Sequence, residues 1–143
     1  MSVVLSLWLQ FFLSFFSQFN ASLENIFLQN QAQQLTSLLS TSAPVMISLT
    51  EPLNFSDCFS AEQAKVVVET IFNQVTTREF LVDQSQPLIW NNHGAIISAR
   101  WSFVSRNSSK KYLLRLYFFI SFEKSGGKEG LRAVIREIRA ERL

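Results

Sequence analysis

The segment from Lys111 to Phe122 constrains the fold more strongly than any other part of this 143-residue sequence. Its apolar residues fall at every second position, which is the period of a β-strand with one buried face. These residues are Tyr112, Leu114, Leu116, Phe118, Ile120 and Phe122. The segment from Ala95 to Val104 alternates in the same way, and a polar turn over 106–109 joins the two. We therefore predict a long antiparallel hairpin whose apolar face packs under helices.

Two amphipathic helices are predicted before these strands. The second is the better defined, because Ser60-Ala61-Glu62-Gln63 matches a capping box. Its apolar residues then follow at helical spacing, at Ala64, Val67, Val68, Ile71, Phe72 and Val75. The first helix is expected from Ser22 to Ser40, with Ser22 as its N-cap. Alternating residues also predict strands over 45–50 and 80–83.

The segment over 131–141 fits two patterns. Leu131, Val134, Ile135 and Ile138 share one face of a helix, and periodicity alone favours that reading. The same β-branched residues follow a turn at Ser125–Lys128, which is typical of the second strand of a hairpin. We adopt the strand because of the family resemblance given below.

The first 21 residues contain no charged side chain and are strongly apolar. The stretch has about the length of the apolar region of a secretory signal and is slightly short for a membrane span. It has no Lys or Arg before the apolar run, and Phe19 stands where a small residue is preferred before cleavage after Ala21. We expect residues 1–21 to be a leader, either a signal peptide or an anchor, before one domain over 22–143. The protein would then be exported, periplasmic or membrane-anchored; the alternative is a buried first helix.

The charge is unevenly distributed. Residues 1–99 hold two basic and seven acidic side chains, whereas residues 100–143 hold eleven basic and four acidic ones. The basic residues are spread through strand-like segments and alternate with Glu near the C-terminus, which is typical of a self-paired, solvated face. We therefore expect no nucleic-acid partner. A single Cys58 and a single His93 exclude an internal disulfide and any site that needs two histidines, and no metal or cofactor is expected.

The order of helix, strand, capped helix and antiparallel strands resembles the nuclear transport factor 2-like, or cystatin-like, α+β cone. The resemblance is carried by Phe59-Ser60-Ala61-Glu62-Gln63-Ala64, Phe80, Gly94-Ala95 and the closing Ala133–Arg139 segment, after an apolar leader. It is closest to a small family of exported bacterial proteins of unknown function. It implies two or three N-terminal helices packed on a curved antiparallel sheet of four to six strands. That family transfers no catalytic residue to this chain.

The chemical candidates are few. Asp83 at a strand end and His93 in a turn are the weak candidates for a general acid or base. An apolar ligand pocket is predicted to be lined by Phe72, Trp90, Trp101 and Phe103. Cys58 lies between Asp57 and Phe59, and we interpret it as a small buried residue and not as a nucleophile.

The second face of the long strand breaks the alternation expected of a solvated sheet. Leu113, Tyr117 and Phe119 are apolar there, with Arg115 among them, and we predict that these four residues form a homodimer or partner interface. The alternative is that residues 1–40 fold over this face. The function expected is that of an exported, non-catalytic domain that binds a protein partner or a small apolar ligand. An isomerase- or hydrolase-like enzyme, or a domain with a basic surface for nucleic acid or lipid, is the alternative.

Overall fold

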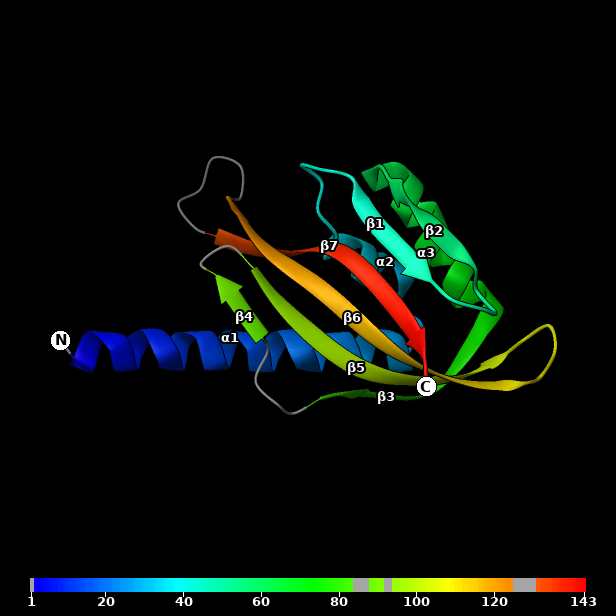
Figure 1. The fold of residues 1–143 in the computed structure, drawn as a ribbon, viewed down its shortest axis with the longest axis horizontal. Coiled ribbons are helices and arrows are strands. Elements are labelled where there is room, and N and C mark those ends of the chain that lie inside the picture. Colours follow the sequence, from blue (N-terminus) through cyan, green and yellow to red (C-terminus); the bar gives the residue numbers. More distant parts are fainter. Residues whose placement is uncertain (1, 84–87, 92–93, 125–130) are drawn as a thin grey trace.

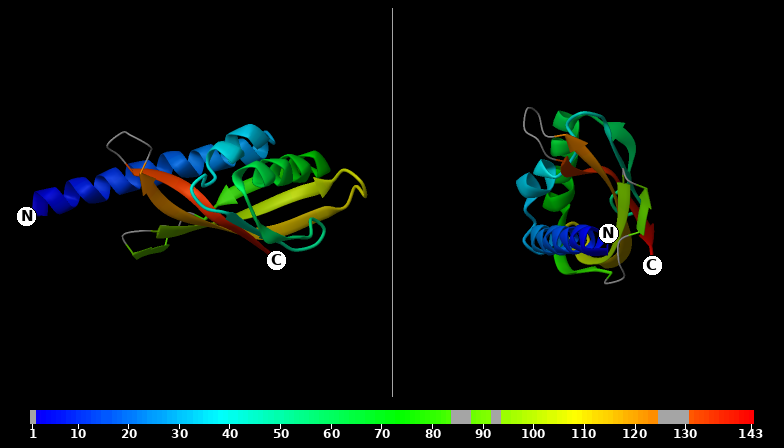
Figure 2. Two further views of the ribbon diagram at one scale, coloured as in Figure 1. Left: turned by 90° about the horizontal axis from the view of Figure 1, so that it is seen from above. Right: turned by 90° about the vertical axis from the view of Figure 1, so that its left-hand side faces the viewer.

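The fold is an α+β arrangement in which three helices cover one face of a mostly antiparallel sheet, as Figures 1 and 2 show. The computed structural model describes residues 2–83, 88–91, 94–124 and 131–143. The helices are α1 (Ser2–Leu28), α2 (Ala32–Ser37) and α3 (Ala61–Gln74). The strands are β1 (Val45–Leu49), β2 (Phe55–Phe59), β3 (Val75–Val82), β4 (Leu88–Asn91), β5 (Gly94–Ser105), β6 (Lys111–Lys124) and β7 (Leu131–Arg142). The predicted fold class is confirmed.

Six strands follow one another across the sheet in the order β2-β1-β7-β6-β5-β3, and the short β4 pairs with β5 beside this path. All neighbours are antiparallel except β1 and β7, which run parallel. The predicted hairpin of β5 and β6 is confirmed, and both strands lie inside the sheet, between β7 and β3. The apolar face of β6 lies under the helices, with Leu114, Leu116 and Phe118 buried as expected.

The first helix begins and ends at different places than the sequence predicted. Ser22 does not cap a helix, because α1 runs without a break from Ser2 to Leu28 and no Gly or Pro interrupts it. The helix ends at Asn30, whose φ of 50° is left-handed. The amide of Gln31 donates to the carbonyl of Ile26 at 2.9 Å, and that of Asn30 donates to Phe27 at 3.3 Å. These two bonds make a Schellman cap, in which Asn replaces the usual Gly.

The α1 helix divides into two parts. Its C-terminal part packs into the core, where Phe16, Phe19, Leu23 and Phe27 are buried. Its N-terminal turns extend past the sheet (Figures 1 and 2), and Val3 and Leu7 are 69% and 60% exposed. Among the described residues, no helix has the length and apolarity required to cross a membrane.

The α3 helix is confirmed, including its cap. The Ser60 hydroxyl accepts from the amide of Gln63, and the Gln63 side chain accepts from the amide of Ser60, which is the reciprocal pair of a capping box. The predicted apolar stripe is the buried face of this helix.

The C-terminal segment is a strand, as adopted above, and a β-bulge explains why its pattern mimics a helix. Phe119 lies opposite Glu137, but the next residue, Ile120, lies opposite Ile135. Arg136 is therefore the extra residue of a bulge, and it shifts the inward face by one position. The inward residues become Ala133, Ile135, Ile138 and Ala140. Ile135 and Ile138 thus lie on one side of the sheet although they are three residues apart, which is the spacing of neighbours on a helix face.

Three short elements depart from the sequence predictions. The strands β2 and β4 were not predicted from the sequence. The strand expected near Phe80 already begins at Val75, directly after α3. Cys58, expected to be buried, is exposed on the edge strand β2.

Candidate functional site

A small cavity lies between the three helices and the sheet, where the predicted pocket was expected. Its volume is about 20 Å³, which is room for little more than one water-sized sphere. All its described lining residues are apolar: Phe27, Leu35, Ile47, Leu49, Val68, Ile71, Phe72, Trp101, Leu116 and Ile138. A cavity of this kind holds no hydrogen-bonding partner for water, so it is expected to be dry.

Aromatic rings fill the space around this cavity. Phe27 stacks on Phe80 with ring centroids 4.2 Å apart, and it meets Phe72, Trp101 and Phe118 edge-on at 5.3, 5.2 and 5.8 Å. These are the separations of favourable aromatic pairs. A single residue at the end of α1 therefore holds rings from α3, β3, β5 and β6 together.

The four predicted pocket residues have different positions. Phe72 and Trp101 line the cavity. Phe103 is fully buried with its ring 4.4 Å from that of Trp101, but it is not among the residues that line the cavity. Trp90 belongs to β4, and its side chain lies outside the described part of the structure, as does all of His93. The indole of Trp101 donates to the Thr77 hydroxyl at 2.9 Å.

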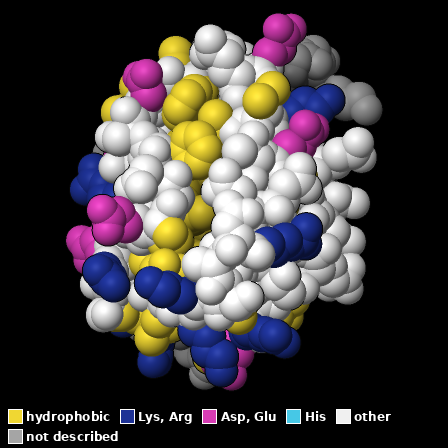
Figure 3. All heavy atoms as spheres, turned by 90° about the vertical axis from the view of Figure 1, so that its right-hand side faces the viewer, with side chains coloured by type: hydrophobic (Ala, Val, Ile, Leu, Met, Phe, Trp, Pro, Cys, Tyr) yellow, Lys and Arg dark blue, Asp and Glu magenta, His cyan; other side chains and the backbone are white. Residues whose placement is uncertain are grey.

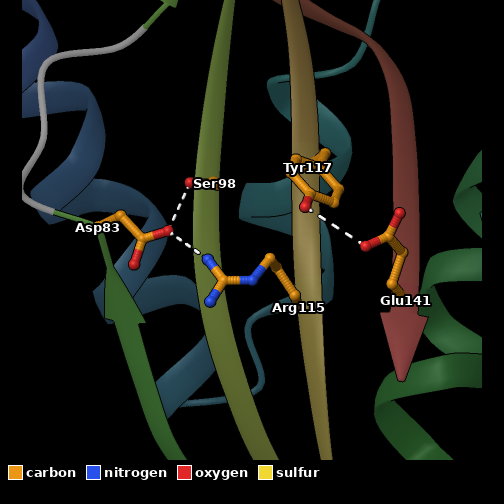
Figure 4. Close-up of polar contacts among 5 residues, drawn as sticks. All are labelled: Asp83, Ser98, Arg115, Tyr117 and Glu141. Carbon is orange, nitrogen blue, oxygen red and sulfur yellow. Dashed lines mark hydrogen bonds and ion pairs between the residues drawn. The ribbon is translucent and has the colours of Figure 1, made fainter. Parts of the chain in front are cut away.

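Asp83 and its partners lie on the face of the sheet turned away from the helices (Figure 4), whereas the cavity lies on the helix-covered face. Its carboxylate accepts a hydrogen bond from Ser98 at 2.5 Å and an ion-paired bond from Arg115 at 2.8 Å. These two partners come from β5 and β6, and their side chains alternate with the buried ones. The structure thus places Asp83 in a polar group on the outer face and does not bring it to the cavity.

The same outer face carries the four predicted interface residues. Tyr117 donates to Glu141 on β7 at 3.4 Å (Figure 4), and the Arg139 guanidinium lies 5.5 Å from the centre of the Phe119 ring. Arg139 also pairs with Glu137 at 3.0 Å. Leu113 is 46% exposed. Residues 2–28 lie on the helix-covered face, so the described part of the N-terminal segment does not cover the outer face.

Across the outer face, apolar and charged residues form rows that run perpendicular to the strands. One row contains Leu81, Arg100, Arg115 and Glu141, which are cross-strand neighbours on β3, β5, β6 and β7. The next row contains Ser98, Tyr117 and Arg139. Leu81 is 55% exposed at the β3 edge. The face is therefore mixed in polarity, and its described ion pairs neutralise much of its charge locally.

Glu123 forms a polar cluster that the sequence did not indicate. Its Oε1 accepts hydrogen bonds from Ser40 and Ser42 at 2.6 Å each, and Arg136 lies 3.7 Å away. Ser40 is completely buried, and its amide donates to the carbonyl of Ile135 on β7. The cluster fastens the chain after α2 to β6 and β7. Burial alone raises the pKa of Glu123, but the two hydroxyls and the charges of Arg136 and Arg132 outweigh it and lower that pKa.

We expect this cluster to make the stability of the folded protein depend on pH. Because the pKa of Glu123 is lower in the folded state, its contribution is present above the unfolded value near 4.5 and disappears as pH falls through the folded value. Glu123→Gln should therefore be less stable than the parent at pH 7 and approach it in acid. Urea unfolding at a series of pH values measures this, with Glu51→Gln on an exposed turn as the control. A stability difference that stays constant with pH would contradict the prediction.

One end of the molecule shows how the charged side chains are arranged on that face. Seen from the end that carries the β5–β6 turn, most of the visible Lys and Arg side chains lie in the lower part of the view, and hydrophobic side chains form a band that runs from top to bottom (Figure 3). Within the described residues, no three His, Cys, Asp or Glu side chains gather closely enough to hold a metal ion.

Solved structures show the same architecture. A nuclear transport factor 2-like protein of unknown function in nutrient uptake from Rhodospirillum rubrum superposes with a TM-score of 0.62 at 8% identity, covering 89% of this chain and 97% of its own. A ketosteroid isomerase-like protein from Erwinia carotovora atroseptica gives 0.60 at 8% identity, covering 83% and 86%. A cystatin-like domain of unknown function from Nostoc punctiforme gives 0.57 at 9% identity, covering 89% and 76%.

Because the sequence identities are low, these similarities concern the fold alone. Neither a protein-family model nor a curated protein sequence matches this chain. The superpositions nevertheless cover 83–89% of this chain and 76–97% of the three solved chains. The chain therefore has the nuclear transport factor 2-like, or cystatin-like, α+β fold that its sequence resembles.

Proposed function

We propose that this protein is a non-catalytic association domain whose outer sheet face binds a second copy of the same chain. The observation that carries the proposal is the exposure of Leu81 and Leu113, at 55% and 46%, on a face where Arg115 and Arg139 are each paired with a carboxylate of the same face. Burying exposed apolar side chains at an interface is favourable, and removing water from charges that are already paired costs less free energy than removing it from unpaired ones. This combination is typical of the centre of an interface.

The residue types support the same conclusion. Tyr117 and Arg115 lie side by side near the middle of the face, and Tyr and Arg are enriched at the energetic centres of interfaces. Both are already held in place, Tyr117 by Glu141 and Arg115 by Asp83. Side chains that are ordered before binding lose less conformational entropy when the interface forms.

The cavity supports a ligand-binding role less well. At about 20 Å³ it is far smaller than the several hundred Å³ of a typical ligand pocket, so an organic ligand would require the core to open. The enzymatic alternative lacks an acid or base at the described cavity lining. Asp83, the one candidate whose side chain is described, is bound to Arg115 and Ser98 on the other face.

Replacing Tyr117 and Phe119 together by Glu should convert the protein into folded monomers. Each copy would bring two new charges into the buried centre, and we expect the dissociation constant to rise by roughly a hundredfold or more, since single hot spots are worth 2 kcal/mol or more. Sedimentation of the full chain in a mild non-ionic detergent measures the association. The matched control is Val66→Glu, which replaces a residue 60% exposed on α3, away from this face. A parent protein that is monomeric at high concentration would refute the proposal.

A further inference from the structure

The N-terminal turns of α1 differ from the rest of the helix because they extend beyond the folded body. Figures 1 and 2 show this part of the helix projecting past the strands, on the same axis as the part that packs on the sheet. Phe15 and Phe16 pack on the sheet, and their rings both lie 6.4 Å from that of Phe122 near the end of β6. Beyond that point, Val3 and Leu7 are exposed.

The sequence of the projecting turns is apolar around most of the helix. At 100° per residue, the polar positions Ser2, Ser6, Gln10 and Ser14 repeat every four residues and form one stripe that covers about a third of the circumference. The other positions between 3 and 13 are all apolar, and the segment carries no charged side chain. A helix that contacts one partner helix needs a single apolar stripe, whereas a helix that is apolar on nearly all sides requires apolar surroundings on all sides.

We propose that residues 2–14 insert into a lipid bilayer as a retained anchor, while the rest of α1 stays in the core of the domain. A helix of this length measures about 20 Å, which exceeds one leaflet and falls short of the roughly 30 Å hydrocarbon core. The buried Phe16 and Phe19 keep the following turns in the protein, so the anchor enters the membrane from one side. The inference is independent of the dimer proposed above.

Charge near the point of emergence supports a membrane as the surrounding medium. Phe122, which contacts the emerging helix, is followed on β6 by Glu123 and Lys124, and their cross-strand neighbours on β7 are Arg132 and Leu131. Arg132 and Arg136 are both exposed on this part of the sheet. These basic side chains would lie at the level of the lipid headgroups, where Lys and Arg are favoured by anionic lipids.

The test is flotation of the full chain with vesicles of phosphatidylcholine, with and without phosphatidylglycerol. We expect the parent to float with both, and somewhat more with the anionic lipid. Val3→Asp combined with Leu7→Asp should weaken binding by roughly tenfold or more, because charges within the hydrocarbon region are costly. Leu28→Asp, at an exposed position on the last turn of the same helix, is the matched control and should bind like the parent.

The depth to which the anchor inserts into the bilayer is measured separately by the fluorescence of Trp8. Lipids brominated on the acyl chains should quench emission in the parent more than in Trp8→Phe. Binding that requires anionic lipid and disappears in high salt would overturn the proposal, as that is surface adsorption through basic residues. It would also be overturned if the variant with both Val3→Asp and Leu7→Asp bound vesicles normally. The same holds if the only effect of these substitutions was to dissociate an oligomer that is soluble in water without lipid. Intact mass of the protein from its natural host that showed loss of residues 1–21 would overturn it as well.

Discussion

A chain that begins at Ser22 is expected to lose most of its stability, whereas a chain that begins at Ser14 is expected to keep it. The first truncation removes Phe16 and Phe19, which are 4% and 7% exposed. Losing a buried Phe side chain costs about 3–5 kcal/mol, and whole domains are stable by about 5–15 kcal/mol. The second truncation removes only the projecting turns, where Val3 and Leu7 contribute little to the core.

Urea unfolding followed by circular dichroism compares the two truncated chains with the full one. The chain from Ser14 serves as the control for the loss of helix length, since it retains Phe16, Phe19, Leu23, Ile26 and Phe27, the α1 side chains that the structure describes as buried. If the chain from Ser22 unfolds cooperatively at the same urea concentration as the full chain, the two Phe side chains are dispensable. This result would favour a leader that is cleaved after Ala21 and would count against the anchor.

Phe27→Ala is expected to destabilise the domain by about 3–5 kcal/mol, the usual cost of emptying a Phe site in a core. The reason is its position, because its ring contacts Phe72, Phe80, Trp101 and Phe118. It also lines the cavity, so the substitution should enlarge that space into an apolar pocket. Differential scanning calorimetry measures the loss, and Phe27→Leu, which refills most of the volume, is the control.

The enlarged pocket offers a second measurement of the same prediction. Benzene or a similar small apolar molecule should raise the melting temperature of Phe27→Ala and leave that of the parent unchanged, since ligands stabilise only the state that binds them. A change of less than about 1 kcal/mol in stability for Phe27→Ala would show that the surrounding rings collapse into the space.

The sequence predicted the elements whose side chains obey one local period. The α3 helix and its cap, the β5–β6 hairpin and the buried face of β6 depend on neighbours within a few residues, and all are confirmed. The short strands β2 and β4 were missed because their sequences, FSDCF and LIWN, do not alternate between apolar and polar residues. The end of α1 was missed because Asn30 adopts a left-handed conformation that is usually associated with Gly.

The candidate sites were harder to predict because their contacts are distant in sequence. The bonds from Ser40 and Ser42 to Glu123 span 83 and 81 residues, so no local pattern pointed to that cluster. Asp83 directly follows β3. A shift of one residue in the register of that strand would move its side chain from one face of the sheet to the other. By contrast, the outer face of β6 was readable, because its alternation places Leu113 and Tyr117 away from the buried residues.

The position of β7 in the sheet has a consequence for how the chain folds during synthesis. It lies between β1 and β6, so the β1–β2 hairpin joins the other strands only through it. While the ribosome is still making β5 and β6, the β1–β2 hairpin has no neighbour to pair with, and the apolar face of β6 lacks one side of its sheet. Folding must therefore wait for translation of β7, and chains stalled before that point expose unpaired strand edges that chaperones recognise and that promote aggregation.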